Sequence, residues 1–242
     1  KDETLKLISE TNPKFAFIDR SEGLYYEDFS WIKESGIPYC VFDASQYLTN
    51  ILSGSYISPF DMGFDLILSS LHKNFPGPQK ALLATKSIDS YWHKIISGTS
   101  TFISNSHPEE MFMAGESIKQ IEKLKIYSNE LLRISKELES NLYELNVNVL
   151  KKDDNKIPTQ HIWVLFDNKN ICYSSFKNLE KIGLYTNYRL LPYRLGYGLR
   201  IGVGGAIQSG LRKENVSELA KLISECISKG YSSDLNQESR NF

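Results

Sequence analysis

Three charged residues stand where the chain pattern predicts strands of a sheet. Asp43 follows the apolar residues 38–42, Lys73 follows the apolar run 64–70, and Arg200 lies inside another apolar stretch. A lysine amine can form a Schiff base with an aldehyde, a carboxylate can keep a ring nitrogen protonated, and an arginine can hold a carboxylate through two parallel hydrogen bonds. Because adjacent parallel strands end at one edge of a sheet, we expect Asp43 and Lys73 to lie at the same edge.

Pyridoxal phosphate is a cofactor whose chemistry needs this combination of groups. A lysine attaches it as a Schiff base, and a carboxylate keeps the pyridine nitrogen protonated, so that the ring accepts electrons from a carbanion at Cα. An arginine holds the α-carboxylate of the substrate. The ordered set of Asp43, Lys73 and Arg200 therefore predicts a pyridoxal-phosphate site for a small amino-acid substrate.

Each residue has a simpler interpretation when it is taken alone. Asp43 is consistent with a helix cap, Arg200 with an edge-strand residue that faces water, and His72 with a surface position. The glycines at 202, 204 and 205 are a weak signal for a phosphate-binding loop, because they follow a late strand and lack both the P-loop lysine and the dinucleotide spacing. Only the ordered combination, with a Gly-Pro turn after Lys73, favours pyridoxal chemistry.

The first half of the chain alternates short apolar runs with amphipathic stretches. Expected strands cover residues 14–18, 38–42, 64–70 and 81–85, and expected helices cover 3–11, 28–34 and 46–54. A polar loop over 97–107 leads to a long helix from 108 to about 143, with a break allowed within it. The alternation predicts an α/β fold with a mostly parallel sheet.

The second half has a different character. Expected strands cover 159–166, 183–185 and 198–203, expected helices 174–179 and 214–229, a polar hairpin or inter-domain loop 151–156, and a frayed end 232–242. We therefore expect three parts. Residues 1–107 form the C-terminal part of a large cofactor-binding domain, 108–143 a connecting helix, and 144–242 a small C-terminal α/β domain.

Composition narrows the class of protein. The 242 residues are 41% hydrophobic and 24% charged, which is typical of an ordinary globular protein. A formal net charge of −1 gives no reason to expect nucleic acid or an anionic membrane as a partner. No apolar run is long enough to span a bilayer, and nothing near Lys1 reads as a signal peptide. Three scattered cysteines and no Cys/His cluster predict a reducing, cytoplasmic setting without a structural metal.

The motifs around these residues resemble those of serine hydroxymethyltransferase, a pyridoxal-phosphate enzyme of the aspartate-aminotransferase-like fold. The likeness rests on residues 42–46, 69–79 and 198–202 and runs with gaps along 12–229. It implies that Lys73 is the Schiff-base lysine with His72 before it as a second catalytic residue, and that Asp43 pairs with the pyridine nitrogen. It also implies that Arg200 binds the substrate carboxylate. Further implied positions are Ser21 near the phenolic oxygen, Gln46, Ser70 and Ser106 at the cofactor, and His161 in the small-domain strand.

Several positions depart from the family pattern. Gln46 replaces the histidine of the Asp motif, and Leu71 replaces the last threonine before His-Lys. Pro76 and Gln79 stand where the family has two arginines after the lysine. Residues 104–107 replace a glycine-rich loop, and Arg189 replaces a second asparagine. The resemblance implies that this last segment lines a folate pocket. The changes are compatible with pyridoxal chemistry and put the use of tetrahydrofolate in doubt.

The family's first half has no counterpart here, and the first residue is not Met. Three explanations are open: a fragment of a longer protein, an enzyme split between two chains, or a degenerate homologue. The resemblance implies a transferase of amino-acid and one-carbon metabolism acting at Cα–Cβ of a β-hydroxy amino acid, with a homodimer or an assembly with a chain that supplies the first half. The alternatives are a folate-independent threonine-type aldolase or transaldolase, and a non-catalytic subunit completing a split enzyme.

Overall fold

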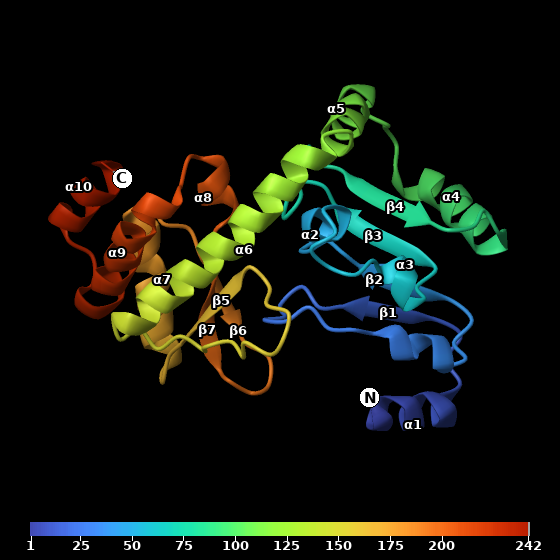
Figure 1. Ribbon diagram of the computed structural model, residues 1–242, viewed down its shortest axis with the longest axis horizontal. Coiled ribbons are helices and arrows are strands. Elements are labelled where there is room, and N and C mark those ends of the chain that lie inside the picture. The colour runs from blue at the N-terminus through green and yellow to red at the C-terminus, as the bar shows by residue number, and fades with distance from the viewer. Residues whose placement is uncertain (242) are drawn as a thin grey trace. The chain divides into compact units, whose positions relative to one another are not determined.

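A computed structural model describes residues 1–241 and divides them into two compact units. Unit 1 comprises residues 1–21 and 27–128, and unit 2 comprises 22–26 and 129 onward. The division falls inside the long helix α6 (Ile121–Glu144), which contributes residues to both units (Figure 1). The three-part division expected from the sequence, with boundaries at 107 and 143, stays a prediction.

Unit 1 is built on a four-stranded sheet in the order β1-β2-β3-β4 (Figure 1). The strands are β1 (Ala16–Asp19), β2 (Cys40–Asp43), β3 (Leu66–Ser70) and β4 (Ala81–Thr85). β1, β2 and β3 run parallel, whereas β4 pairs antiparallel with β3. The expected parallel-dominated α/β fold is thus confirmed, and the antiparallel β4 means that the loop carrying Lys73 joins two neighbouring strands.

The helices of unit 1 follow the expected order with local differences. They are α1 (Asp2–Thr11), the 3₁₀ helix η1 (Ser30–Glu34), α2 (Leu48–Leu52), α3 (Pro59–Met62), α4 (Ser90–Phe102) and α5 (Pro108–Ile118). The break allowed in the long helix occurs between α5 and α6. The polar loop expected over 97–107 is wrong for its first part, because α4 continues to Phe102. Asp89 caps α4 by accepting from the Trp92 amide at 2.9 Å, and serine and threonine hydroxyls along the helix donate to carbonyls of the preceding turn.

The two faces of the first sheet bury different sets of side chains. On one face, Phe42 and Phe64 meet edge to face with ring centroids 5.2 Å apart. A second cluster contains Tyr39, Val41 and Leu66, against which Trp92 and Ile95 of α4 pack. Burial on both faces explains why β2 is a continuous apolar run rather than an alternating one.

Unit 2 holds a three-stranded antiparallel sheet in the order β5-β7-β6, formed by β5 (His161–Leu165), β6 (Asn187–Leu190) and β7 (Tyr197–Gly202). The short strand expected at 183–185 is wrong, because this part of the chain forms strand only from Asn187. The helices are α7 (Lys169–Lys181), α8 (Gly204–Gln208), the 3₁₀ helix η2 (Lys213–Asn215), α9 (Val216–Lys229) and α10 (Ser233–Asn241). Contrary to the expected frayed end, residues 233–241 are helical; Phe242 lies outside the described residues.

Helix α6 and residues 22–26 complete the core of unit 2. Leu131, Ile134, Leu138 and Leu142 of α6 are fully buried at helical spacing. Residues 22–26 lie against the chain before β5, since the Tyr26 amide donates to the Ile157 carbonyl at 2.9 Å and the Thr159 amide donates to the Leu24 carbonyl at 2.8 Å. A segment that precedes β2 in the sequence thereby belongs to unit 2, where it lies against the chain that leads into β5.

Candidate functional site

In unit 1, the ends of β2 and β3 are joined by a short chain of hydrogen bonds. Asp43 ends β2, and its carboxylate accepts from the Ser45 amide at 2.8 Å. The Ser45 hydroxyl in turn accepts from the Ser70 amide, at the end of β3, at 3.0 Å. The Ser70 hydroxyl is buried and has no hydrogen-bond partner. A polar atom buried without a partner costs free energy, so this hydroxyl has unused capacity to form a hydrogen bond at the end of β3.

Lys73 lies in the turn between β3 and β4, and its side chain is exposed. The turn is closed at its base, where the Leu71 amide donates to the Lys80 carbonyl at 2.8 Å and the Gly77 amide donates to the Leu71 carbonyl at 2.8 Å. A Cβ added at Gly77 would lie 2.9 Å from the Leu71 oxygen and 2.8 Å from the Phe75 ring, so the turn requires glycine there. The Gly-Pro turn recognised in the sequence therefore has a definite task, which is to fold the chain tightly behind Lys73.

The residue after Lys73 anchors the turn. The Asn74 side chain accepts from the Thr49 amide at 2.8 Å and donates to the Asn50 side chain at 3.0 Å. Asn50 donates onward to the Ser128 hydroxyl at 2.9 Å. All four residues are at most 5% exposed. Sequence reasoning missed this network, because an asparagine after a lysine carries no signal of burial.

The neighbouring Phe75 is also buried and packs with Leu48, Leu71 and Leu124. The two residues after Lys73 are thus both held in place. Hydrogen bonds hold Asn74, and apolar contacts hold Phe75. This arrangement holds the Cα of Lys73 in place while its amine stays exposed.

The other residues predicted for the cofactor site have mixed surroundings. His72 is exposed and Gln46 is half-buried. The Ser21 hydroxyl donates to the Asp19 carboxylate at the end of β1, beside Asp43 in the parallel register. Ser106 is exposed in the loop before α5, and its carbonyl accepts from Lys80 at 3.0 Å. In unit 1 the structure therefore brings Asp43 and Ser70 together through Ser45. The roles of all the predicted site residues, these two included, stay predictions.

In unit 2, Arg200 lies on the face of the sheet opposite to α7 and α9. In the register Arg200 faces Trp163 on β5 and Asn187 on β6. Residues two apart on a strand share a face, so His161 and Arg189 lie on this face as well. Arg200 is 11% exposed and donates to the Glu22 carboxylate at 3.1 Å. Arg189 forms an ion pair with the same Glu22 oxygen at 2.7 Å. Glu22, in a polar loop far from Arg200 in sequence, was not foreseen.

His161 is buried at the start of this sheet. Burial, together with the positive charge of Arg200, lowers the pKa of His161 to about 3. Its Nδ1 lies 3.3 Å from the Gly23 carbonyl, which also accepts from the Thr159 hydroxyl at 2.7 Å. The neutral imidazole therefore holds the loop that carries Glu22 and adds no positive charge beside Arg200.

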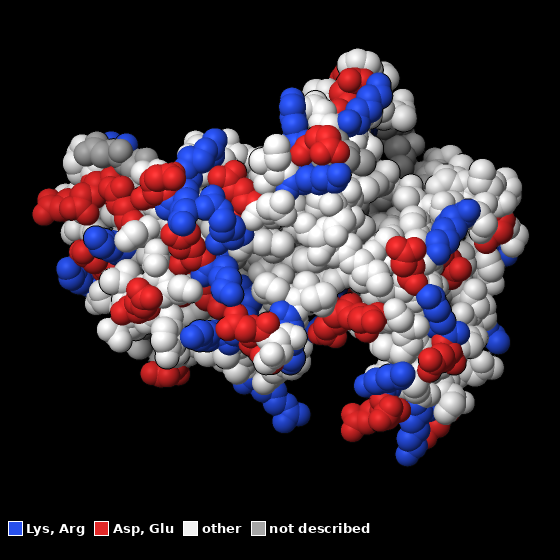
Figure 2. All heavy atoms as spheres, in the orientation of Figure 1, with Lys and Arg blue, Asp and Glu red and all other residues white. Residues whose placement is uncertain are grey.

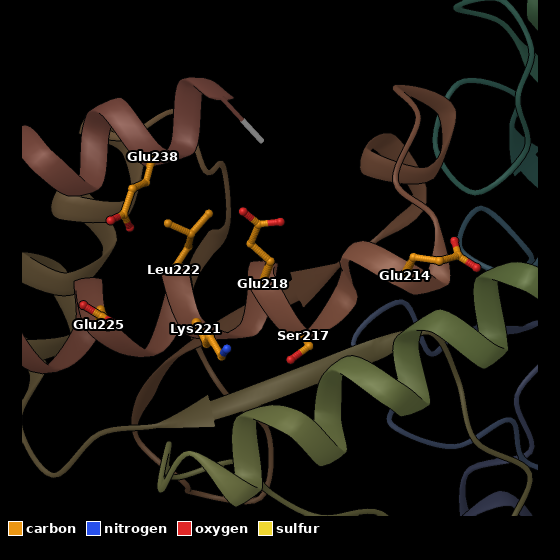
Figure 3. Close-up of a pocket in the computed structure, with 7 residues that line it drawn as sticks. All are labelled: Glu214, Ser217, Glu218, Lys221, Leu222, Glu225 and Glu238. Carbon is orange, nitrogen blue, oxygen red and sulfur yellow. The ribbon is translucent and has the colours of Figure 1, made fainter.

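Unit 2 also has two hollows away from Arg200. One, of about 600 Å³, lies along α9, where Leu222 and Glu218 point toward α10 and Glu238 points back (Figure 3). Four glutamates and one lysine line it, so it would repel an anionic cofactor. The other, of about 650 Å³, is mainly apolar and lies among α8, α9 and the chain that leads into β6. Neither contains a predicted site residue.

Three further observations describe the surface and its chemistry. On the face drawn in Figure 2, acidic and basic side chains are interspersed. Among the described residues, no group of three or more His, Cys, Asp and Glu could hold a metal ion. Within the same residues, every helix is too short or too polar to cross a membrane.

The chain is similar to known proteins along most of its length. No family model matches the chain. A serine hydroxymethyltransferase of Picrophilus torridus is 26% identical over 238 residues, which cover 93% of this chain and 55% of that protein. One of Archaeoglobus fulgidus is 27% identical over 247 residues, covering 96% of this chain and 55% of that protein. The chain spans about half the length of the curated relatives it matches.

A solved structure agrees on the fold. The L-threonine transaldolase from Pseudomonas fluorescens, in an internal aldimine state, superimposes with a TM-score of 0.87 at 19% identity, covering 100% of this chain and 58% of that one. The α/β fold predicted from the sequence is therefore confirmed. The resemblance drawn from residues 42–46, 69–79 and 198–202 is confirmed as well: along nearly its whole length, this chain is similar to the C-terminal portion of serine hydroxymethyltransferases.

Proposed function

We propose that this chain supplies the lysine, the pyridine-binding carboxylate and the carboxylate-binding arginine of a pyridoxal-phosphate enzyme of the serine hydroxymethyltransferase type. The reaction would break or form the Cα–Cβ bond of a β-hydroxy amino acid such as serine or threonine. One observation carries the proposal. Ser45 joins Asp43, at the end of β2, to Ser70, at the end of β3, and the anchored turn that follows β3 presents Lys73.

The residues of unit 1 fit the cofactor. The buried Ser70 hydroxyl lacks a partner and could donate to a phosphate or phenolic oxygen. Asp43 is half-buried at a strand end, where a carboxylate can face a protonated ring nitrogen. Lys73 is exposed on a fixed backbone, so its amine can reach an aldehyde carbon without reordering the turn.

Each residue has a separate task in this proposal. When bound, pyridoxal phosphate withdraws electrons from the substrate Cα. Lys73 holds the cofactor covalently and can accept or return a proton at its amine, Asp43 keeps the ring nitrogen charged, and Ser70 orients the group. Arg200 holds the α-carboxylate of the amino acid, which fixes the orientation of the bonds at Cα. His72, next to Lys73, is proposed to assist at the ring.

A folate-independent aldolase or transaldolase of the threonine type is the second candidate. One observation favours it. Arg189, in the segment that the resemblance aligns with a folate pocket, forms an ion pair with Glu22 at 2.7 Å. An arginine–glutamate pair leaves a charged surface where the family has a neutral asparagine. Product formation from threonine that does not depend on tetrahydrofolate would favour this candidate.

Unit 1 also offers a surface for a partner. Large apolar side chains of α4, α5 and the loop between them are exposed, among them Phe102 at 87%, Phe112 at 70%, Ile103 at 59% and Met111 at 58%. Exposed apolar clusters of this kind are typical of interaction sites. They support assembly with a second copy or with a chain that supplies the groups of the family's first half.

The test is covalent trapping on the intact purified protein, in whatever assembly it forms. Pyridoxal phosphate is added, the visible spectrum is recorded, and borohydride reduction is followed by peptide mapping and intact mass spectrometry. We expect the cofactor on the peptide that contains Lys73, and Lys73→Ala should lose both the absorbance and the label. Lys14→Ala is the control, because Lys14 is an exposed lysine of the same unit.

A Lys73→Ala variant that still carries the label at full occupancy would refute the assignment of Lys73. The intact mass also distinguishes one longer chain, two associated chains and this chain alone. If the protein binds no cofactor in any assembly and serves only to complete another chain's activity, the non-catalytic subunit is the better description.

A further inference from the structure

Glu22 already forms an ion pair with Arg200, the arginine proposed to bind the substrate carboxylate. The Glu22 Oε1 atom lies 3.1 Å from an Arg200 nitrogen and 2.7 Å from an Arg189 nitrogen. The Glu22 side chain is 25% exposed, and its second oxygen, Oε2, is buried with no hydrogen-bond partner. Two guanidinium groups thus share one carboxylate oxygen, while the other oxygen is unused.

The backbone around Glu22 is fixed within unit 2. The Gly23 carbonyl accepts from the Thr159 hydroxyl, and the Leu24 carbonyl accepts from the Thr159 amide. Leu24 itself is buried against Trp163 and Leu191. Glu22 therefore cannot leave Arg200 by movement of its loop without breaking these contacts. It can leave only by rotation of its side chain.

The two arginines differ in how far their side chains are exposed and therefore in how freely they can move with Glu22. Arg200 is 11% exposed in the central strand β7, whereas Arg189 is 40% exposed on the outer strand β6. The three side chains carry two positive charges and one negative charge. The group therefore has one surplus positive charge, enough for one further carboxylate.

We propose that Glu22 is a resident carboxylate that the substrate carboxylate displaces from Arg200, and that Arg189 retains Glu22 during the exchange. This inference rests on the proposed function for the assignment of Arg200. Glu22 and Arg189 are then positioning residues that set the affinity of Arg200 for anions. The surplus of one charge suits an amino acid with a single carboxylate, because a second carboxylate in the ligand would face Glu22.

The test is a titration of the full chain with sodium acetate, without cofactor. Binding is followed through the guanidinium NMR signal of Arg200, which is assigned by its loss in Arg200→Lys. Glu22→Gln removes the competing charge and keeps the side-chain shape, so acetate should bind about fivefold more tightly. Arg189→Gln should weaken binding by a similar factor, because Glu22 would then rest on Arg200 alone.

The double variant separates the two roles. If Arg189 acts through Glu22, Arg189→Gln should have a much smaller effect in the Glu22→Gln background than alone. Glu22→Asp keeps the charge but shortens the side chain by one methylene, so it should give an acetate affinity between those of the wild type and Glu22→Gln. It replaces Glu22→Gln in the titration if that variant folds poorly. Glu180→Gln is the matched control, since it also removes a glutamate charge from unit 2 but Glu180 pairs with Lys177, at 2.6 Å, instead of with an arginine.

Acetate affinity that is unchanged or weaker in both Glu22→Gln and Glu22→Asp would overturn the exchange. Because the titration needs neither cofactor nor Lys73, its outcome is independent of the trapping experiment. Tighter acetate binding in Glu22→Gln with no cofactor on Lys73 would retain the exchange and remove the proposed function. Labelled Lys73 with unchanged acetate binding would do the reverse.

Discussion

The Lys73 turn of unit 1 and the Arg200 face of unit 2 hold a charged side chain in opposite ways. At the turn, the neighbours of Lys73 are anchored, and the lysine itself stays exposed. On the sheet face, Arg200 is itself paired, through Glu22. The first arrangement suits an amine that must react, because direct pairing would occupy it. The second suits a charge that must bind and release a ligand, because a resident carboxylate offsets the cost of burying the arginine.

The two regions should therefore respond to different changes. Loss of a buried anchor at the turn should lower the free energy of unfolding of unit 1 strongly. The Arg200 face depends on charge and should respond mainly to ligands and pH. The variants below probe this difference, beginning with the largest expected effect.

Replacing Phe75 with alanine should have the largest effect on stability. Phe75 is fully buried at 0% exposure and packs with Leu48, Leu71 and Leu124 behind the turn. The lost burial and the resulting cavity should lower the free energy of unfolding by about 3–5 kcal/mol. Urea denaturation measures this change. Phe102→Ala, at 87% exposure, is the control and should shift the value by less than about 0.5 kcal/mol. Equal effects of the two variants would show that the turn is not anchored by its core.

Asn74→Ala should have the next largest effect. It leaves the Thr49 amide and the Asn50 side-chain oxygen without their Asn74 partner in a buried region, while Asn50 still donates to Ser128. An unsatisfied buried polar group costs about 1–3 kcal/mol, so we expect a loss of about 2–3 kcal/mol. We also expect less borohydride-trapped cofactor on Lys73, because the turn loses its fixed position. Asn155→Ala, in an exposed turn, is the control. Unchanged stability together with unchanged trapping would contradict the role of the network.

The smallest expected effect is a pH dependence from His161. Its pKa in the folded chain is lowered to about 3, first by burial and then by the charge of Arg200, whereas an unfolded histidine has its ordinary pKa of 6.5. The unfolded chain therefore binds the extra proton between these values. The contribution of the neutral imidazole to stability is complete above about pH 6.5 and is lost as the pH falls toward 3.

Between pH 7 and pH 5 this linkage should lower the free energy of unfolding by about 2 kcal/mol. His161→Gln should flatten that part of the profile, measured by urea denaturation at each pH. His93→Gln changes an exposed histidine of α4 and should leave the slope as it is. A slope that survives His161→Gln would assign the pH dependence to other groups.

Local patterns predicted much of the fold. Apolar runs before Asp43 and Lys73 placed β2 and β3 correctly, and helical spacing placed α6 and α9. Errors arose where local chemistry was ambiguous. The Ser/Thr-rich end of α4 looked like a loop because its hydroxyls can satisfy backbone carbonyls in either state. The polar residues of α10 looked frayed, although Leu235 is buried and the Ser239 hydroxyl donates to the Ile182 carbonyl.

The sequence by itself determined which residues end the strands, and therefore that Asp43 and Lys73 belong to one edge of a parallel sheet. Only the tertiary structure decided what surrounds them. Glu22 meets Arg200 because residues 22–26 pair with the chain before β5. Asn74 is buried because α2 supplies its partners Thr49 and Asn50, and Asn50 in turn donates to Ser128 of α6. Such contacts join residues far apart in the chain, and no local spacing encodes them. A strand end is set by short-range pattern, whereas the partner of a charge is set by packing.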